Sequence, residues 1–442
     1  MSLAMSIRGR GPVGSAARTA MVLSRFGPTA SAMARRLDRY AAIASDFGIQ
    51  PTWPTTACVL ARHPELVRRL AERGAEIAVH GLVHGDHKAL DREAQREAIG
   101  RAMDIFERDG IRPAGFRGPY LRYNAATLEV LRALGLRYHS SQAVAFPLWD
   151  NDPDPGRVQS YELALDLYSA RDANRVSVIP RLQDGLVDIP VAVPDDEILV
   201  ERLRLDEGAR ISQWLHMLDV TYDRGALFPL QLHPERIDEL GEALRATLAE
   251  ARRRRPSVFI ARLDEIASWW LRRSAFALDV GRSGDRRYRV RLRADPDATL
   301  LVRGLDVART PWYGNDEISH QPDFEVESQR APVVGLSRRS LPAVRGFIAE
   351  EGFPVEVSDD REAYGAYVDV DSDRWSEVDV LQAIDRGPGP LARIWRWPEG
   401  ARSALAVTGD IDALTLRDFV TRSWETRGYR MGGGIDHEPT LA

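Results

Sequence analysis

The sequence predicts an α/β fold, either a parallel sheet or an α/β barrel, together with a smaller β-rich region. Short apolar runs alternate with amphipathic segments of helical spacing through residues 30–272. Near Ser274 the pattern changes to alternating polar and apolar residues, as in residues 288–293. A further buried strand is predicted near the C-terminus, at residues 403–408. At 442 residues the chain is too long for one ordinary core, so we expect two domains.

The first part of the chain is predicted to alternate between helices and strands. Helices are expected at residues 31–47, 64–73, 91–106, 125–134, from 211, 236–255 and 263–272. Strands are expected at residues 49–55, 77–79, 187–193, 227–232 and 257–262, with a strand end near Phe116. Functional groups in such folds collect at the C-terminal ends of the strands.

The β-rich region contains no residues at metal-ligand spacing. Strands are predicted at residues 288–293, 300–305 and 324–329. One helix is predicted there, at residues 341–350.

Composition excludes several classes of function. The 60 basic and 65 acidic side chains leave a formal net charge of −5, which gives no basis for nucleic-acid binding. No apolar run approaches the ~20 residues that span a bilayer. Residues 1–14 lack the apolar segment of a signal peptide. Cys58 is the only cysteine, so we expect no intramolecular disulfide and a cytoplasmic location.

Two histidines at the end of the predicted strand 77–79 indicate a metal site. His80 and His84 lie four residues apart on a glycine-containing loop, where two imidazoles can converge on one divalent cation. Gly81 occupies the place of the glutamate in the zinc-protease pattern H-E-x-x-H, so that pattern is excluded. A carboxylate must therefore come from another segment. The alternative is that these histidines are ordinary core or surface residues.

The predicted strand at residues 403–408 ends in two carboxylates. Asp410 and Asp412 stand at positions i and i+2, which point to the same side of a strand. They are candidates for the missing metal ligand and for a general base. The alternative is that they are turn residues.

These motifs resemble those of the polysaccharide deacetylase family, the NodB-homology or carbohydrate esterase 4 group. The segment from His80 to His84 is similar to the family's H-[ST]-x-x-H motif, with Gly81 as a departure. Residues 117–120, Arg-Gly-Pro-Tyr, match its R-x-P-Y motif in full. The late L-x-H motif is represented by His233, with Gln231 at the leucine position.

The family's first motif, T-F-D-D-G, is missing from its usual place. The only aspartates before His80 are Asp38 and Asp46, which are unpaired, whereas residues 408–412 read Thr-Gly-Asp-Ile-Asp. This order suggests a circular permutation in which the C-terminus supplies the first strand. Insertion within one chain is the simpler expectation. Exchange of the strand between two chains would give a homo-oligomer.

The resemblance implies a distorted (β/α) barrel of the NodB type, completed by the C-terminal strand. We predict a deacetylase-like α/β domain at residues 1–274, lacking its first strand, and a β-rich domain of unknown role at 275–395. Residues 396–442 would supply the returning strand and helix. By the same resemblance, Asp412, His80 and His84 would hold Zn²⁺ or another divalent transition metal.

The remaining site residues take roles from the chemistry of amide hydrolysis. Asp410 would accept the proton of the attacking water, and Arg117 would pair with Asp410. His233 would protonate the departing amine. The backbone N–H of Tyr120 would help to hold the oxyanion.

The protein is predicted to be a metal-dependent hydrolase that removes an acetyl group from an N-acetylated sugar or polysaccharide. One alternative is an amidohydrolase that cleaves another C–N bond in a small amide, similar to allantoinases or deformylases. Another is a carbohydrate-binding protein without catalysis. Two histidines and one carboxylate could also hold Fe(II) for oxygenase chemistry.

Overall fold

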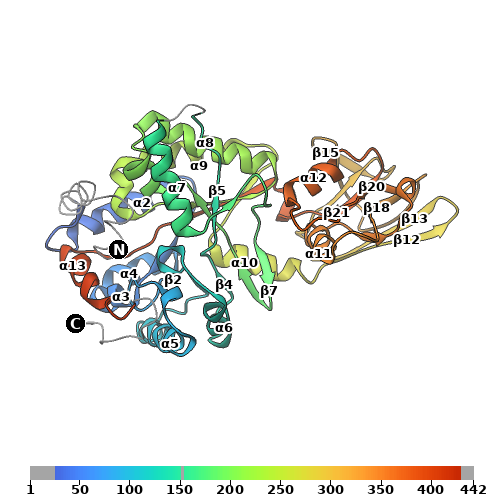
Figure 1. Ribbon diagram of the computed structural model, residues 1–442. Helices are drawn as coiled ribbons and strands as arrows, with labels where there is room; N and C mark the ends of the chain where they lie inside the picture. Colours follow the sequence, from blue (N-terminus) through green and yellow to red (C-terminus); the bar gives the residue numbers. More distant parts are fainter. Residues whose placement is uncertain (1–24, 151–153, 430–442) are drawn as a thin grey trace.

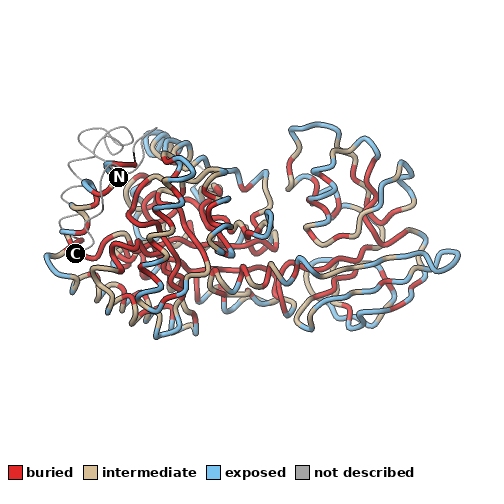
Figure 2. The backbone as a smooth tube through the Cα atoms, turned by 90° about the horizontal axis from the view of Figure 1, so that it is seen from below, coloured by how far each residue is buried: buried red, intermediate tan, exposed pale blue. Residues whose placement is uncertain are grey.

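The computed structural model describes residues 25–150 and 154–429, which form two lobes (Figures 1 and 2). The larger lobe is α/β, and the smaller lobe extends from β12 (Ala277–Gly284) to β21 (Leu391–Ile394). Residues 1–14, where the sequence predicts no signal peptide, lie outside the described residues. Residues 1–24 of the predicted range 1–274 and residues 430–442 of the predicted range 396–442 also lie outside them. Among the described helices, none has both the length and the apolar character needed to cross a membrane.

A curled, half-barrel sheet forms the centre of the larger lobe. Its strand order is β10 (Leu227–Gln231), β22 (Ser403–Thr408), β1 (Thr52–Thr55), β2 (Glu76–Val79), β3 (Gly115–Phe116), β4 (Tyr138–His139), β8 (Leu186–Asp188) and β7 (Arg181–Gln183). The strands pair in parallel, except that β7 runs antiparallel to β8. The predicted mixed α/β architecture is confirmed.

Strand β22 lies inside this sheet although it comes from the end of the chain. On one side it pairs with β10, from Leu227 opposite Ala404 to Gln231 opposite Thr408. On the other side it pairs with β11 (Val258–Ile260) and, at Thr408, with Thr52 of β1. All six residues of β22 are buried. The last strand is thus a central strand of the sheet, inserted within the same chain.

Helices surround this sheet, and two of them begin at the capping residues that the sequence indicates. Asp91 accepts a hydrogen bond from the Ala94 N–H at 2.9 Å, where α5 (Arg92–Arg108) begins. Asn124 accepts one from the Thr127 N–H at 3.0 Å, where α6 (Ala125–Ala133) begins. The other helices of this lobe are α2 (Ser31–Asp46), α3 (Ala57–Arg62), α4 (Pro64–Glu72), α7 (Pro155–Tyr168), α8 (Glu207–Asp223), α9 (Ile237–Arg253), α10 (Leu263–Arg273) and α13 (Leu416–Glu425).

Helix α13 attaches the end of the chain to its beginning. It lies beside α3 in Figure 1, where Arg62 contacts Asp418 at 3.4 Å and also pairs with Glu425. The Leu416 N–H donates to the Gly27 carbonyl at 3.0 Å. The buried residues shown in Figure 2 are concentrated around the central sheet, so the returning segment belongs to the main core.

The smaller lobe contains three sheets. They are β12–β13 (Arg287–Arg293)–β17 (Asp323–Glu327), β15 (Arg309–Tyr313)–β16 (Asp316–Ser319)–β14 (Leu300–Arg303)–β21, and β19 (Val355–Val357)–β18 (Ala331–Leu336)–β20 (Tyr364–Val368). Two helices, α11 (Pro342–Glu350) and α12 (Glu377–Asp385), accompany them. The prediction of a single helix in this region is wrong, because Ser376 caps a second one by accepting from the Asp379 N–H at 3.2 Å.

The predicted strand at residues 187–193 is two strands. Pro190 separates β8 from β9 (Val191–Val193), and the two belong to different sheets. Strand β9 joins a small sheet of order β6 (Arg171–Asp172), β5 (Ala143–Ala145), β9.

Candidate metal centre and active-site cleft

The seven residues singled out in the sequence gather at the C-terminal edge of the central sheet. His80 and His84 follow β2, Arg117 and Tyr120 follow β3, His233 follows β10, and Asp410 and Asp412 follow β22. Five of them (His84, Tyr120, His233, Asp410 and Asp412) line one cleft. Parallel strands present their carboxyl ends at one edge, which is why segments so distant in sequence meet here.

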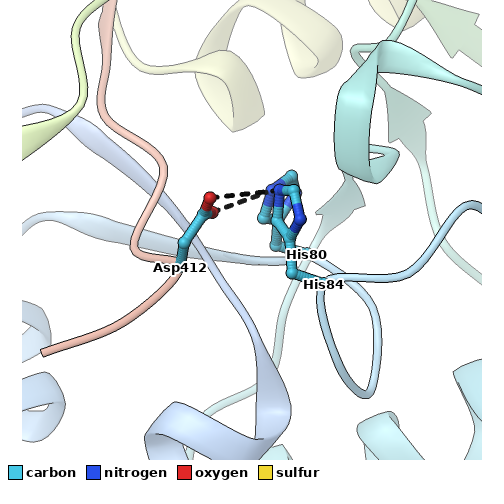
Figure 3. A group of neighbouring side chains, drawn as sticks. All are labelled: His80, His84 and Asp412. Carbon is cyan, nitrogen blue, oxygen red and sulfur yellow. Dashed lines mark ion pairs between the residues drawn. The ribbon is translucent and has the colours of Figure 1, made fainter. Parts of the chain in front are cut away.

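His80, His84 and Asp412 form a compact cluster (Figure 3). His80 Nε2 lies 3.3 Å from Asp412 Oδ1, and His84 Nε2 lies 3.1 Å from Asp412 Oδ2. One ligand atom from each residue fits within 4.8 Å of the other two. Two imidazoles and one carboxylate form a donor set suited to Zn²⁺ and to other divalent transition metals.

The orientation of His80 and the protonation of His84 and Asp412 also suit a cation. His80 Nδ1–H donates to the Arg117 carbonyl at 2.8 Å, which directs Nε2 toward Asp412. Burial lowers the pKa of His84 well below its usual value, although Asp412 opposes this. Burial opposes ionisation of Asp412, but the two imidazoles and Arg422 hold the Asp412 pKa well below its usual range. Neutral imidazoles and an ionised carboxylate are the forms that bind metal.

Two atoms of the cluster have unused hydrogen-bonding capacity. Within the described part of the chain, His80 Nε2 and Asp412 Oδ1 are buried and have no hydrogen-bond partner. Such groups are rare in folded proteins unless a ligand, an ion or water satisfies them. The residues present therefore fit a metal ion.

The local structure explains why residue 81 is a glycine and not the serine or threonine of the family's motif. The φ of Gly81, +82°, lies in the left-handed region. A Cβ at this position would also lie 2.8 Å from Nε2 of the buried His87. A serine or threonine would therefore be strained in this loop.

Arg117 is fully buried and holds Asp410. Its Nη1 donates to Asp410 Oδ1 at 3.0 Å and to Thr408 Oγ1 at 2.8 Å, and its Nε donates to the Ser140 carbonyl at 3.0 Å. The other oxygen of Asp410 accepts from Gln231 Nε2 at 2.9 Å. Gln231, which occupies a leucine position of the family's late motif, thus contacts the proposed general base directly.

His233 is paired with an aspartate that was not selected from the sequence. The His233 ring Nδ1 lies 2.9 Å from Asp196 Oδ1, and the His233 backbone N–H donates to Asp196 Oδ2 at 3.0 Å. Burial favours a neutral imidazole, but the fully buried Asp196 carboxylate overcomes this and raises the pKa of His233 to about 10. His233 is therefore a cation at neutral pH. Asp196 belongs to the sequence Pro194-Asp195-Asp196, which directly follows β9. This position at the end of a strand was the feature of the sequence that could have marked Asp196 as a site residue.

Two further arginines contact the acidic groups of the cleft. Arg236 Nη1 donates to Asp196 Oδ2 at 3.0 Å, and Arg422 Nη1, from α13, donates to Asp412 Oδ2 at 3.0 Å. Arginines are so common in this sequence that neither could be distinguished from a surface residue.

Tyr120 packs against the metal cluster. Its ring lies edge-on to His84 with a centroid separation of 4.4 Å, and its hydroxyl donates to the His84 carbonyl at 3.4 Å. The backbone of Tyr120 is left-handed, with φ of +60°. This uncommon conformation for a tyrosine accompanies a turn at the cleft wall.

Comparison with known proteins identifies the segment that carries two of the motifs. Residues 31–139 match the model of the polysaccharide deacetylase family, and this range contains His80, His84, Arg117 and Tyr120. Over 91 residues the chain is 32% identical to "Peptidoglycan deacetylase-like protein FGM2" of Gibberella zeae. That alignment covers 20% of this chain and 27% of the relative, so the chain matches about a quarter of that protein's length.

Two solved structures show limited similarity to the chain. The "putative polysaccharide deacetylase from Mycobacterium smegmatis" aligns with a TM-score of 0.43 and 23% identity, over 60% of this chain and 85% of that one. The "probable Polysaccharide deacetylase from Pseudomonas aeruginosa PAO1" gives a TM-score of 0.42 and 20% identity, over 53% and 72%.

Proposed function

We propose that this chain, which belongs to the polysaccharide deacetylase family through residues 31–139, is a metal-dependent hydrolase that removes acetyl groups from N-acetylated sugars, polymers included. The observation that carries the proposal is the convergence of His80 and His84, from the family segment, with Asp412 from the C-terminal segment. The family match favours neither the amidohydrolase alternative nor the inactive binding protein. The cytoplasmic location and the homo-oligomer stay predictions.

His80, His84 and Asp412 would hold Zn²⁺ or a related divalent cation. When bound, such a cation lowers the pKa of a water ligand toward neutrality and polarises the carbonyl of the substrate amide. The buried, unpartnered His80 Nε2 and Asp412 Oδ1 support this assignment.

Asp410 would act as the general base. Hydrogen bonds from Arg117 and Gln231 fix its two carboxylate oxygens beside the cluster, where Oδ2 lies 3.7 Å from His80 Nε2. The two hydrogen bonds hold the carboxylate in place to accept a proton from a water molecule beside the cluster.

His233 would act as the general acid. Asp196 keeps the His233 imidazole protonated at neutral pH and fixes the ring through Nδ1, so Nε2 is the nitrogen available to the leaving amine. Proton transfer from Nε2 lets the amine leave as a neutral molecule. The backbone N–H of Tyr120 would donate to the oxyanion, in keeping with the position of Tyr120 on the cleft wall.

A circular permutation would explain the order of the motifs. The location of β22 between β10 and β1 supports it, because the family's first motif would then stand at the end of that strand as residues 408–412. We retain the domain ranges 1–274, 275–395 and 396–442 as part of this proposal.

The test measures acetate release from chitooligosaccharides together with the metal content of the same samples. Asp410→Asn is expected to abolish acetate release while metal stays bound, because this aspartate is not in the His–His–Asp cluster. His80→Gln is expected to lose both metal and activity. His87→Gln, which alters a buried neighbouring imidazole outside the cluster, is the matched control and should keep the metal. Acetate release that persists in Asp410→Asn or in metal-free protein would refute the proposal.

A further inference from the structure

A second cavity, of about 330 Å³, lies between the two lobes. The larger lobe contributes Asp223 and Arg224, and the smaller lobe contributes Arg303, Asp316, Asp385 and Arg393. Trp395 and Arg402 line the cavity from the segment between β21 and β22. This volume falls within the range of small-molecule binding sites. The residues assigned to catalysis are not among those that line it.

The cavity wall holds more positive than negative buried charge. Arg393, Arg396 and Arg402 are each more than nine-tenths buried. Arg396 pairs with the fully buried Glu351 at 2.5 Å, and Arg393 reaches the same carboxylate at 3.4 Å. For Arg402, the described part of the chain offers no carboxylate within 4.0 Å. Two of the three buried guanidinium groups thus share one buried carboxylate. The aspartates that also line the cavity are half-buried (Asp316) or exposed (Asp223 and Asp385).

Part of this arginine cluster has no hydrogen-bond partner. Among the described residues, Nε of Arg393 and Nε of Arg402 are buried and unpaired. Burial, reinforced by repulsion from Arg396, lowers the pKa of Arg393 to about 9 and that of Arg402 to about 10. Burying a cation without an anionic partner is unfavourable, so this arrangement needs a compensating group.

Aromatic rings compensate in part and also orient the guanidinium groups. Arg402 stacks over Tyr313 at 4.0 Å and over Trp395 at 5.0 Å, and Arg393 lies 4.6 Å from the Trp395 ring. The exposed Arg272 provides a comparison, since it stacks on Trp269 at 5.2 Å but also pairs with Asp295 and Asp297. Stacking alone therefore does not account for Arg402, which has no carboxylate partner among the described residues.

We propose that this interlobe cavity binds a small molecule through a polyvalent oxyanion, a phosphate or a dicarboxylate. Guanidinium groups form paired hydrogen bonds with both kinds of oxyanion, and the side chains of Arg393 and Arg402 line the cavity. The proposal is independent of the deacetylase assignment. Arg402 precedes β22 and Asp410 follows it, so the two sites lie roughly 26 Å apart along an extended strand of eight residue steps.

The experiment measures binding of inorganic phosphate, pyrophosphate and malonate to the full chain by calorimetry and thermal shift. Ionic strength is held constant with sodium chloride. We expect saturable binding by at least one of these anions, and at least tenfold weaker binding by Arg402→Gln and Arg393→Gln. Arg272→Gln is the matched control and should bind like the parent protein. The preferred anion distinguishes a phosphate ligand from a dicarboxylate.

A measurement on the unmodified protein keeps the test decisive if the variants fail to fold. Hydrogen exchange with and without the tightest anion should show protection at β21, at the β15–β16 hairpin and around Arg402. No saturable binding by any anion at millimolar concentration, protection confined to the catalytic cleft, or equal binding by Arg402→Gln and Arg393→Gln would overturn the proposal.

Discussion

Replacing Asp196 by asparagine should move the alkaline limit of activity to lower pH. Asp196 raises the pKa of His233 to about 10 against the opposing effect of burial. Without the carboxylate, burial remains, and the His233 pKa should fall to its ordinary value of about 6.5 or below. A general acid with a raised pKa is protonated below that pKa and loses its proton as pH rises past it. The variant should therefore lose activity between roughly pH 6.5 and 10, where the parent protein keeps His233 protonated.

The size of the effect follows from the protonated fraction of His233. At pH 8 a histidine of pKa about 10 is about 99% protonated, whereas one of pKa about 6.5 is about 3% protonated. If proton donation by His233 limits the rate, acetate release at pH 8 should therefore fall by about thirty-fold. A bound cation would lower the His233 pKa in both proteins, so the measured quantity is the difference between their alkaline limits.

The assay is kcat/KM for acetate release between pH 5 and 10.5 in metal-loaded protein. Breaking a buried ion pair costs about 3–5 kcal/mol, so circular dichroism must first establish that the variant is folded. Asp196→Glu retains the charge and should retain the alkaline limit. Asp195→Asn is the matched control, because this adjacent buried carboxylate bonds to the Ile198 N–H instead of to His233. Coincident alkaline limits for Asp196→Asn and the parent protein would refute the reasoning.

Three other outcomes are expected. Gly81→Ala should lower the free energy of unfolding by about 2 kcal/mol in urea titrations, because φ is +82° and the added Cβ would lie 2.8 Å from His87. Gly100→Ala, which has open space in α5, should raise the free energy of unfolding by about 0.5–1 kcal/mol. Equal changes in stability for the two variants would contradict the strain argument. Arg117→Lys cannot bind Asp410, Thr408 and Ser140 at the same time, so it should reduce acetate release by about 100-fold with the metal content unchanged. Full activity in this variant would show that the guanidinium group is dispensable. Removal of metal by a chelator should lower Tm and added zinc should restore it, since free metal at 100 times Kd stabilises the folded protein by about 2.7 kcal/mol. A Tm that changes with neither treatment would argue against a metal site.

Much of the larger lobe could be predicted because its local signals agree with the fold. The capping residues Asp91 and Asn124 stand where α5 and α6 begin, and apolar runs mark β10 and β22. The carboxylates after β22 could be placed near His80 because a parallel sheet brings its strand ends together. Helix α12 was missed because it has only nine residues and its capping serine follows a polar stretch.

Parts of the site depend on packing that no local pattern encodes. Asp196 differs from the adjacent Asp195 only in the partner that it meets, since one faces His233 and the other the N–H of Ile198. Gln231 appeared as a departure from a motif because its contact is with Asp410, 179 residues away. The constraint at Gly81 depends on the ring of His87, whose burial the sequence does not reveal.

The position of β22 affects how the protein can be made. Until residues 403–408 have been synthesised, the backbone groups of β10 and β1 that pair with β22 have no partner strand. Folding from the N-terminus, as nascent chains generally do, would hold this lobe in an aggregation-prone intermediate through the synthesis of the entire smaller lobe. Chaperone dependence and inclusion-body formation should therefore be pronounced for products that terminate before Ser403.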